Sequence, residues 1–425
     1  MDADSFHRLA KVLADSGEAK TIEGAQAAFE AYGVRVVLEQ GVASDIASQV
    51  IALTVINAAS RSFMGNVLVE AADDFLLQAP GFAGQRLSEF KAWASVSSSH
   101  SLKAMDWPTI QIGSVDAAPA AGVLCPWADG WSCGVGPRGD TGGEFFAPAC
   151  VAAAGLAVSE AFSMLRGDNP YAGRRALSLS LWQPELGTIG PHEQGPHGLE
   201  VPGAWLVGLG HLGQAYAWTV GFMKQSAGSV LALQDVDATT RSTISTSLLS
   251  TVSEIGRMKT AVVDSWLSER GFKTSVVERR FDQHQRVGPG EPRLALFGVD
   301  NAAARRAIES AGFDFVVDAG LGSGFKDFRA LRVRTFPGPS SAAELWGVAQ
   351  ADIGSPQAPA YQALLAAGAD PCGVTTLATR AVGAPFVGCV AAAYVIAELL
   401  RRHADQVPHS VIDMNLRDPA RLQAL

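Results

Sequence analysis

The residues best suited to chemistry begin with a glycine turn in the second half of the chain. Residues 204–214 read Ala-Trp-Leu-Val-Gly-Leu-Gly-His-Leu-Gly-Gln, an apolar run that enters the pattern Gly-x-Gly-x-x-Gly. Gly208 permits a tight turn, Gly210 permits close approach of a phosphate, and Gly213 permits close packing of the following helix. The first N–H groups of that helix attract an anion. The pattern predicts a nucleotide phosphate site.

Polar residues at the ends of later apolar runs indicate which nucleotide chemistry the site serves. Asp235 ends the next run, where a carboxylate can bind ribose hydroxyls, and Asp237 lies two residues on. Lys259 can hold phosphates as a point charge. Asp300 ends a third run, and a carboxylate facing phosphates is a natural Mg²⁺ ligand. A dehydrogenase needs neither Lys259 nor Asp300 here, so the set favours ATP with Mg²⁺; solvated surface charges are the alternative.

The composition is that of a globular protein with large cores. The 425 residues are 48% hydrophobic and 18% charged, which leaves room for two or three domains. A net charge of −9 argues against a nucleic acid partner. Five cysteines without a Cys-x-x-Cys pair suit the cytoplasm and disfavour a zinc cage. The acidic start is no signal peptide, and the longest apolar stretch, residues 386–400, is too short for a membrane span.

Alternating strands and helices must position these residues. In the second half, residues 315–320 and 331–335 read as further strands, and residues 337–371 are a connection rich in Pro, Ala and Gly. In the first half the pattern predicts strands at 34–41, 66–70 and 109–116 and helices at 45–59 and 146–165, after two short amphipathic helices within residues 5–32.

The two halves share features in the same order, which indicates an internal duplication. The matching pairs are Gly41 with Gly208, Glu70 with Asp235, residues 113–116 with 298–300, and Cys150–Ala154 with Cys389–Ala393, each cysteine run being followed by a glutamate, Glu160 or Glu398. The first copy has lost most of its glycines and both phosphate-binding features. It therefore reads as a degenerate partner domain.

We expect an α/β protein of two Rossmann-like domains that form an internal pseudo-dimer. Residues 1–33 are an N-terminal helical segment, and residues 34–183 are the degenerate domain. Residues 184–202, rich in Gly, Pro and His, are a linker. Residues 203–425 are the domain with the complete site.

The second half resembles the ThiF, MoeB and ubiquitin-activating enzyme superfamily. The resemblance rests on Gly-x-Gly-x-x-Gly, Asp-x-Asp, Gly-x-x-Lys, Val-Asp-Asn-x-x-x-Arg and Val-Val-Asp-Ala-Gly, in that order. It covers residues 200–425 well and 34–166 faintly. The duplicated layout is similar to ubiquitin-activating enzymes and, more narrowly, to the BilD-like component of bacterial ubiquitin-like conjugation operons of antiviral defence. The resemblance implies two ThiF-type adenylation domains, one of them inactive.

The resemblance also implies a reaction. ATP would adenylate the C-terminal glycine of a ubiquitin-like protein, a cysteine would capture the acyl group, and a conjugating enzyme would receive it. By analogy Asp235 holds ribose, Lys259 neutralises phosphate charge and Asp300 holds Mg²⁺. Cys372, in the segment 337–380, is the expected nucleophile, because a helix start follows Pro371 and stabilises a thiolate. The alternative for Cys372 is a small buried residue at a domain join.

The remaining cysteines are expected to be structural; they are Cys125, Cys133, Cys150 and Cys389. The chain departs from the family in three ways. Gly210 is followed by His211 where the family has a second glycine. Residues 242–247 replace the family run Ser-Asn-Leu-x-Arg-Gln, so Arg241, or Arg61 of the degenerate half, is the candidate for the missing arginine. The family's zinc cysteines are absent.

Three other functions stay open. One is adenylation without a thioester, as in sulfur-carrier activation. A second is a pseudo-enzyme scaffold that binds a ubiquitin-like partner, which the missing Asn and Arg motivate. A third is an NAD-dependent oxidoreductase, although the sequence offers no Tyr-x-x-x-Lys proton donor. We expect a cytoplasmic protein without a membrane or nucleic acid partner; pairing of two chains and the identity of the ubiquitin-like protein are left open.

Overall fold

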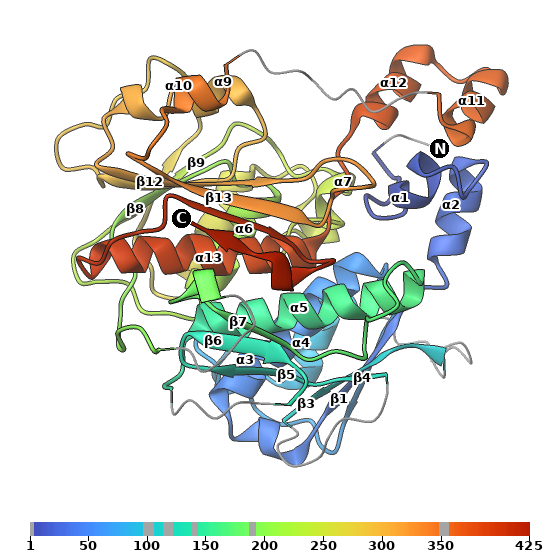
Figure 1. Ribbon diagram of the computed structural model, residues 1–425, viewed down its shortest axis with the longest axis horizontal. Coiled ribbons are helices and arrows are strands. Elements are labelled where there is room, and N and C mark those ends of the chain that lie inside the picture. Colours follow the sequence, from blue (N-terminus) through green and yellow to red (C-terminus); the bar gives the residue numbers. More distant parts are fainter. Residues whose placement is uncertain (1–3, 97–105, 114–121, 138–142, 187–192, 348–356) are drawn as a thin grey trace.

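The computed structural model describes residues 4–96, 106–113, 122–137, 143–186, 193–347 and 357–425. Figure 1 shows two α/β halves, with two long helices side by side where the halves meet. These helices are α5 (Ala147–Arg166) of the first half and α13 (Pro385–His403) of the second. The expected fold, two Rossmann-like halves that pack as a pseudo-dimer, is confirmed.

The second half is built on one sheet, in the order β10-β9-β8-β11-β12-β13-β14-β15. Neighbours are parallel from β10 to β12 and antiparallel from β12 to β15. Its strands are β8 (Ala204–Val207), β9 (Leu231–Gln234), β10 (Thr274–Val277), β11 (Leu294–Phe297), β12 (Phe315–Leu321), β13 (Ala330–Phe336), β14 (Val411–Asn415) and β15 (Gln423–Ala424). Because β8, β9, β11 and β12 are parallel, their carboxyl ends meet at one edge, where ligands bind in such sheets.

Helices connect these strands. They are α6 (His211–Val220), α7 (Arg241–Ile244), α8 (Lys259–Ser268), α9 (Ala302–Arg306), α10 (Ala342–Leu345), α11 (Pro359–Ala366) and α12 (Pro371–Thr379). The connection 337–371 therefore contains two short helices that the sequence pattern did not predict. Four to eight residues of mostly small side chains carry too little periodicity to predict a helix. Residues 348–356 of this connection lie outside the described part.

The first half repeats the strand order of the second. Its strands are β1 (Val34–Leu38), β2 (Val67–Ala71), β3 (Thr109–Ile112), β4 (Val123–Leu124), β5 (Pro126–Asp129), β6 (Ser132–Val135) and β7 (Leu177–Ser180). They form two sheets, β2-β1-β3-β4 and β5-β6-β7. Only Cys125 separates β4 from β5. When β4 and β5 are taken together as the counterpart of β12, the order of the first half corresponds to β9-β8-β11-β12-β13-β14 of the second. The helix α3 (Ile46–Ser62) follows β1 as α6 follows β8.

The two matched glutamates make the same contact in each half. Glu160 accepts a hydrogen bond from the backbone N–H of Gly173 at 3.1 Å, and Glu398 accepts one from the backbone N–H of His409 at 2.8 Å. Each bond fixes the segment that leads from the long helix into the following strand, β7 or β14. The first-half residues 114–116, matched to 299–300 by sequence, lie outside the described part.

The helices α5 and α13 form the contact between the halves. A Cβ atom at Gly155 would lie 2.7 Å from the carbonyl oxygen of Phe386, so the glycine permits this close approach. The matched residues Cys150 and Cys389 are both buried. Among the described helices, α5 alone has the length and hydropathy of a membrane span, and 89% of that stretch is buried in the protein.

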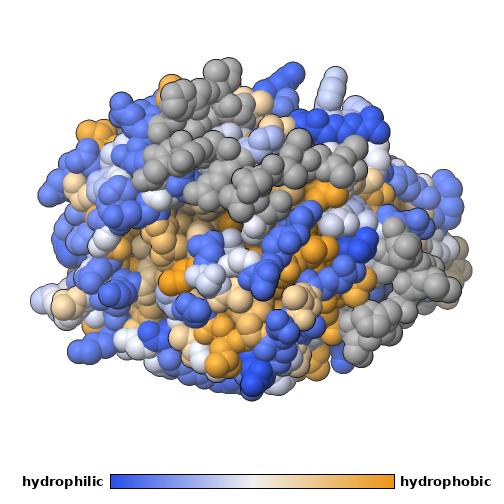
Figure 2. Space-filling view, turned by 90° about the horizontal axis from the view of Figure 1, so that it is seen from below, coloured by the Kyte–Doolittle hydropathy of each residue, from blue (hydrophilic) through white to orange (hydrophobic). Residues whose placement is uncertain are grey.

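Aromatic side chains extend the contact between the halves. Trp93 of the first half, on α4 (Leu87–Trp93), stacks on Trp218 and Trp266 of the second. The guanidinium of Arg270 lies 3.2 Å from the Trp266 ring centroid and 4.8 Å from that of Phe82. Figure 2 shows the molecule from below, where apolar side chains gather over part of the face.

The N-terminal segment forms the predicted short helices, α1 (Lys11–Asp15) and α2 (Ile22–Phe29). Figure 1 shows α11 and α12 beside these helices and apart from the two sheets. Within the predicted linker, residues 187–192 lie outside the described part. The arrangement matters because the N-terminal segment also reaches the cavity at the strand ends.

Candidate active site

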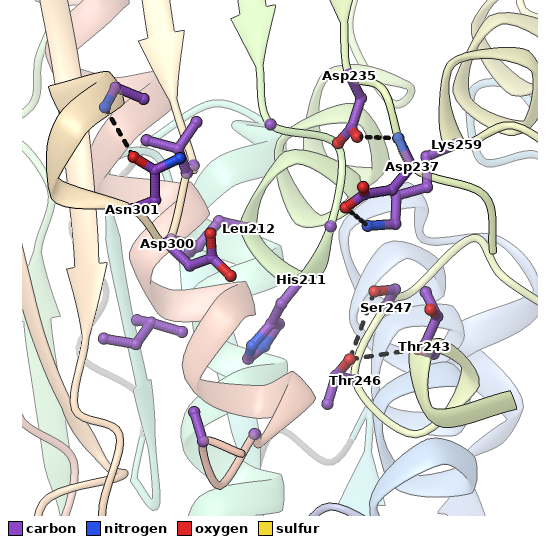
Figure 3. A pocket seen from close by; sticks show the side chains of 18 of the residues that line it. His211, Leu212, Asp235, Asp237, Thr243, Thr246, Ser247, Lys259, Asp300 and Asn301 are labelled. Carbon is purple, nitrogen blue, oxygen red and sulfur yellow. Dashed lines mark hydrogen bonds and ion pairs between the residues drawn. The ribbon is translucent and has the colours of Figure 1, made fainter. Parts of the chain in front are cut away.

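A cavity of about 940 Å³ lies at the carboxyl ends of β8, β9, β11 and β12. Figure 3 shows residues of its wall converging from the ends of different strands and from the start of α6. The lining includes the sequence-predicted residues Gly208, Gly210, Asp235, Asp237, Lys259 and Asp300. Most of the predicted nucleotide residues therefore meet in one place.

At each glycine of the turn, a side chain would strain the backbone, clash with a neighbour or fill space that a ligand could occupy. Gly208 has φ of +83°, and a Cβ atom there would lie 2.9 Å from the side chain of Val299. A Cβ atom at Gly213 would lie 2.1 Å from the carbonyl oxygen of Gly208, so α6 packs directly on the turn. Around Gly210 no atom lies within 4 Å of such a Cβ atom, which leaves open space for a ligand.

Asp235 holds the glycine turn to the segment after β9. One carboxylate oxygen accepts the backbone N–H of Leu209 at 2.6 Å, and the other accepts those of Val236 and Asp237 at 2.7 and 2.8 Å. Charge-assisted bonds of this kind are stronger than neutral ones. A carboxylate has about four lone-pair sites, so one site is left for a further donor.

Lys259 begins α8 and is held by Asp237. Its ammonium lies 2.9 Å from the Asp237 carboxylate, and its backbone N–H donates to the Asp237 carbonyl at 2.9 Å. The Lys259 side chain is 14% exposed and that of Asp237 is 62% exposed. The lysine is therefore placed at the cavity wall by a more exposed partner, and Figure 3 shows the two side chains paired.

Asp300 lines the cavity together with Arg8, a cation that sequence reasoning missed. Asp300 follows β11, and the next residue, Asn301, caps α9 by accepting the backbone N–H of Ala304 at 2.8 Å. Arg8, from the N-terminal segment, lines the same cavity. Burial lowers the pKa of Arg8 to about 10, while the charges of Asp300 and Asp4 raise it. No motif marks Arg8; only packing brings it to the cavity.

The two arginines proposed from sequence do not line the cavity. Arg241 begins α7 and is exposed, and its backbone N–H donates to Asp4 at 2.9 Å. Arg61 is buried on α3 and donates to the carbonyl oxygens of Ile244, at 3.3 Å, and Ser250. Burial lowers the pKa of Arg61 to about 9. Arg61 therefore holds the loop after α7 in place and is not itself a lining residue.

Cys372 is exposed in the first turn of α12. Asp370 caps this helix by accepting the backbone N–H of Gly373 at 2.7 Å. The other end of α12, Thr379, lines the cavity. At a rise of about 1.5 Å per residue, Cys372 lies about 10 Å along the helix from that end.

The other four cysteines are more enclosed, and all five are free thiols. Burial raises the pKa of Cys133 and of Cys389 to about 12. It also raises the pKa of Cys150, whose thiol is wholly buried, and that of the half-buried Cys125. Cys372 is thus the accessible thiol of the chain.

The N-terminal segment joins the cavity to the helices that carry Cys372. The ammonium of Lys11 donates to the carbonyl of Ala378 at 2.9 Å, and the hydroxyl of Tyr361 bonds to Asp15 at 2.5 Å. The same segment supplies Arg8 to the cavity. One short stretch of chain therefore contacts the cavity and also α11 and α12, the second of which carries Cys372.

Two smaller hollows extend the cavity along the open face of β12–β14. The first, of about 240 Å³, shares Arg305 with the main cavity and is also lined by Arg332, Arg334 and Trp346. The second, of about 670 Å³, continues from it to Tyr171 in the first half. Together the three form a track from the strand ends to the seam between the halves.

A buried ion pair lies where the track leaves the cavity. The Asp318 carboxylate on β12 bonds to the Arg305 guanidinium at 3.0 Å. Burial raises the pKa of Asp318, and the nearby Arg305 opposes that change. Since both partners are nearly buried, the pair fixes the wall at this point.

Comparison with known proteins gives the class. A family profile described as the BilD C-terminal domain matches residues 202–406, and one described as the BilD N-terminal domain matches residues 33–181. A curated relative, the bacterial E1-like protein BilD of Collimonas sp. (strain OK412), is 40% identical over 418 residues, 95% of this chain and 89% of the relative. The chain belongs to the BilD family of E1-like proteins, which confirms the resemblance inferred from its motifs.

Solved structures with a related arrangement are distant. E. coli MccB, described in one structure with ATP, is 14% identical; the match covers 71% of this chain and 94% of that one, with a TM-score of 0.36. E. coli tRNA N6-threonylcarbamoyladenosine dehydratase, TcdA, is 13% identical over 48% of this chain and 88% of that one, with a TM-score of 0.31.

Proposed function

We propose that this protein uses ATP to adenylate the C-terminal glycine of a ubiquitin-like protein and then carries the acyl group as a thioester on Cys372. The observation that carries the proposal is the meeting of Gly210, Lys259 and Asp300 in one cavity of an E1-like chain. A glycine turn, a lysine and a carboxylate at strand ends suit phosphate chemistry. A hydride-transfer reaction would have no use for this lysine and carboxylate.

In the first step, a carboxylate oxygen of the glycine attacks the α-phosphorus of ATP. The bond to the oxygen that bridges the α- and β-phosphates breaks, and pyrophosphate leaves with that electron pair. The N–H groups at the start of α6 and the ammonium of Lys259 stabilise negative charge on the phosphates. Asp235, which keeps one acceptor site free, is positioned to bind ribose.

Arg8 supplies the positive charge that binds the phosphates. In the family this charge belongs to an arginine that follows the acidic pair. It is a lining residue, whereas Arg241 and Arg61 are not. The charge of Asp300 raises the pKa of Arg8, so the two charges attract each other. An arginine that reaches the site from the N-terminal segment, residues 1–33, makes that segment necessary for activity.

The residues of the cavity also fit Mg²⁺. No group of three or more His, Cys, Asp or Glu side chains suited to a metal exists among the described residues, so a cage built by protein alone is absent there. Mg²⁺ usually takes one or two carboxylates together with substrate phosphates. Asp300 is that carboxylate, and the ion would neutralise charge on the phosphates.

The track along β12–β14 is the path for the C-terminal tail of the ubiquitin-like protein. Three arginines line the groove that opens into the cavity, Arg305, Arg332 and Arg334, and two carboxylates of the same lining, Asp318 and Asp413, pair with Arg305 and Arg332, so the groove is slightly positive. An extended tail in this groove would present its terminal carboxylate at the strand ends. The globular part would then lie over the seam near Tyr171, which is 66% exposed.

In the second step, the thiolate of Cys372 attacks the carbonyl carbon of the acyl-adenylate. The carbon–oxygen bond to AMP breaks, AMP leaves with the electron pair, and the thiol proton passes to solvent. A conjugating-enzyme-like protein then accepts the acyl group. We place this reaction in the cytoplasm, where the five thiols stay reduced, and, by the family resemblance, in antiviral defence.

ATP–pyrophosphate exchange with a ubiquitin-like protein encoded beside this gene tests the first step. Exchange should need the partner's free C-terminus, and a thioester that dithiothreitol cleaves should form on the parent chain and disappear in Cys372→Ala, with Cys125→Ala as the matched control. Exchange without any thioester would reduce the function to adenylation alone. ATP binding without exchange would support a scaffold, the reading that the missing family Asn and Arg motivate.

A further inference from the structure

The antiparallel strands β12, β13 and β14 carry charged side chains on one face of the sheet. Every second residue of a strand points to the same face, and this face forms the hollow of about 240 Å³ beside the main cavity. In the strand ladder, Asp318 lies opposite Arg334. One row further on, Arg332 lies between Gly320 and Asp413. Helix α13 packs against β12 and β13, and the charged face is open to a ligand.

Two of the three arginines in this hollow are paired with carboxylates. The Nε atom of Arg305 donates to Asp318 at 3.0 Å, and the Nε atom of Arg332 donates to Asp413 at 2.7 Å. Asp318 is therefore bound by Arg305, although Arg334 lies opposite it in the ladder. Both carboxylates that line the hollow already have an arginine partner.

Arg334 is the third arginine, and it forms no ion pair within the described part of the chain. Its Nε atom is buried there without a hydrogen-bond partner. Its guanidinium lies 5.7 Å from the ring centroid of Trp346, and that of Arg305 lies 5.4 Å from the same centroid. Burial and the charge of Arg332 lower the pKa of Arg334. A partly buried cation among like charges is costly, and a bound anion would remove that cost.

The position of Arg334 limits where that anion comes from. The hollow joins the main cavity at Leu321 and Gly322, which line both. From Asp318, opposite Arg334, to Gly322 the strand advances about 13 Å, at about 3.3 Å per residue. An extended peptide covers this distance with about four residues. A tail with its terminal carboxylate at the strand ends would therefore bring one of its last few side chains to Arg334.

We propose that Arg334 determines specificity by binding an Asp or Glu side chain within about five residues of the terminal glycine of the ubiquitin-like protein. The inference rests on the proposed function and adds the chemistry of the tail. The planar guanidinium suits a carboxylate, which it can bind through two parallel hydrogen bonds. A basic tail side chain at the same place would meet the positive charge of Arg334 without a free carboxylate, so the hollow rejects it.

Calorimetric titration with the ubiquitin-like protein encoded beside this gene, without ATP, tests the pairing. Arg334→Gln should weaken binding about tenfold, the effect of losing one charge-assisted hydrogen bond. Gln in place of the tail acid should do the same, and the two changes together should weaken binding no further. Arg334→Glu combined with Lys in place of the tail acid should recover most of the affinity. Arg293→Gln, which removes an exposed ion pair with Asp314 outside the three hollows, is the matched control and should bind like the parent.

ATP binding separates a lost contact from a damaged fold. Arg334 lies outside the lining of the main cavity, so Arg334→Gln should keep the Kd for ATP alone within about twofold of the parent. Additive losses in the double variant, no binding by the parent, or a partner without Asp or Glu in this part of its tail would overturn the proposal. The titration needs no turnover. An inactive chain that responds to the charge exchange would therefore refute the proposed reaction alone, and an active chain that ignores the exchange would refute this inference alone.

Discussion

The ammonium of Lys259 lies 2.9 Å from the carboxylate of Asp237, and the two residues are also joined by a backbone hydrogen bond of 2.9 Å. The pair holds the lysine at the cavity wall before any nucleotide arrives. Because Asp237 is mostly exposed, the ion pair contributes little to folding, about 1 kcal/mol or less. The ion pair matters mainly because it places the positive charge of Lys259 at the cavity wall, where the phosphates would bind.

Lys259→Ala should lower kcat/KM for pyrophosphate exchange about 100-fold, because one preorganised positive group on the phosphates is lost. The free energy of unfolding should change by about 1 kcal/mol or less. Exchange kinetics and denaturant unfolding measure the two effects. The matched control is Lys224→Ala, a lysine that is exposed and outside the cavity. Unchanged exchange in Lys259→Ala would mean that this lysine does not bind the phosphates.

Arg8→Ala should also lower exchange about 100-fold, whereas Arg241→Ala should stay within about twofold, because Arg8 lines the cavity and Arg241 does not. Arg8→Lys should recover part of the activity, since a lysine keeps the charge but loses the planar guanidinium. Titration of ATP by a binding assay separates a loss of affinity from a loss of turnover. A large loss in Arg241→Ala with none in Arg8→Ala would reverse this assignment.

Asp300 could be predicted from the sequence as a residue of the cavity, whereas Arg8 could not. Asp235, Lys259 and Asp300 each follow or flank a strand pattern, and parallel strands bring their carboxyl ends together, so the cavity could be predicted. Arg8 reaches it only because the N-terminal segment packs beside α7, and no local pattern records that packing. Arg241 and Arg61 are the candidates that the sequence offers, yet neither is a lining residue.

Gly155→Ala should destabilise the protein by about 1–3 kcal/mol, because the added methyl group would be forced into α13. Its Cβ atom would lie 2.7 Å from the Phe386 carbonyl oxygen and 3.0 Å from the Cys389 Cβ atom. Gly41→Ala is the matched control, since no atom lies within 4 Å of its Cβ position. Denaturant midpoints measure both. Equal midpoints for the two variants would show that the long helices have room to separate.

The stability of the N-terminal segment should depend on pH through His7. Its Nδ1 accepts the backbone N–H of Leu9 at 3.3 Å, and its Nε2 therefore donates to the carbonyl of Arg61 at 2.8 Å. This pattern requires a neutral ring. Burial lowers the pKa of His7 from 6.5 to about 4. The unfolded chain thus binds the proton more tightly than the folded one between these values.

Stability from His7 is therefore complete above pH 6.5 and is lost as the pH falls towards 4, by about 3 kcal/mol at most. His7→Gln keeps the donor to Arg61 and cannot titrate, so its unfolding free energy should fall less than that of the parent over this range. His211 titrates in the same direction, so part of the loss remains. His284→Gln, at an exposed position, should follow the parent. Parallel curves for the parent and His7→Gln would mean that the His7 ring is accessible to protons without loss of its contacts.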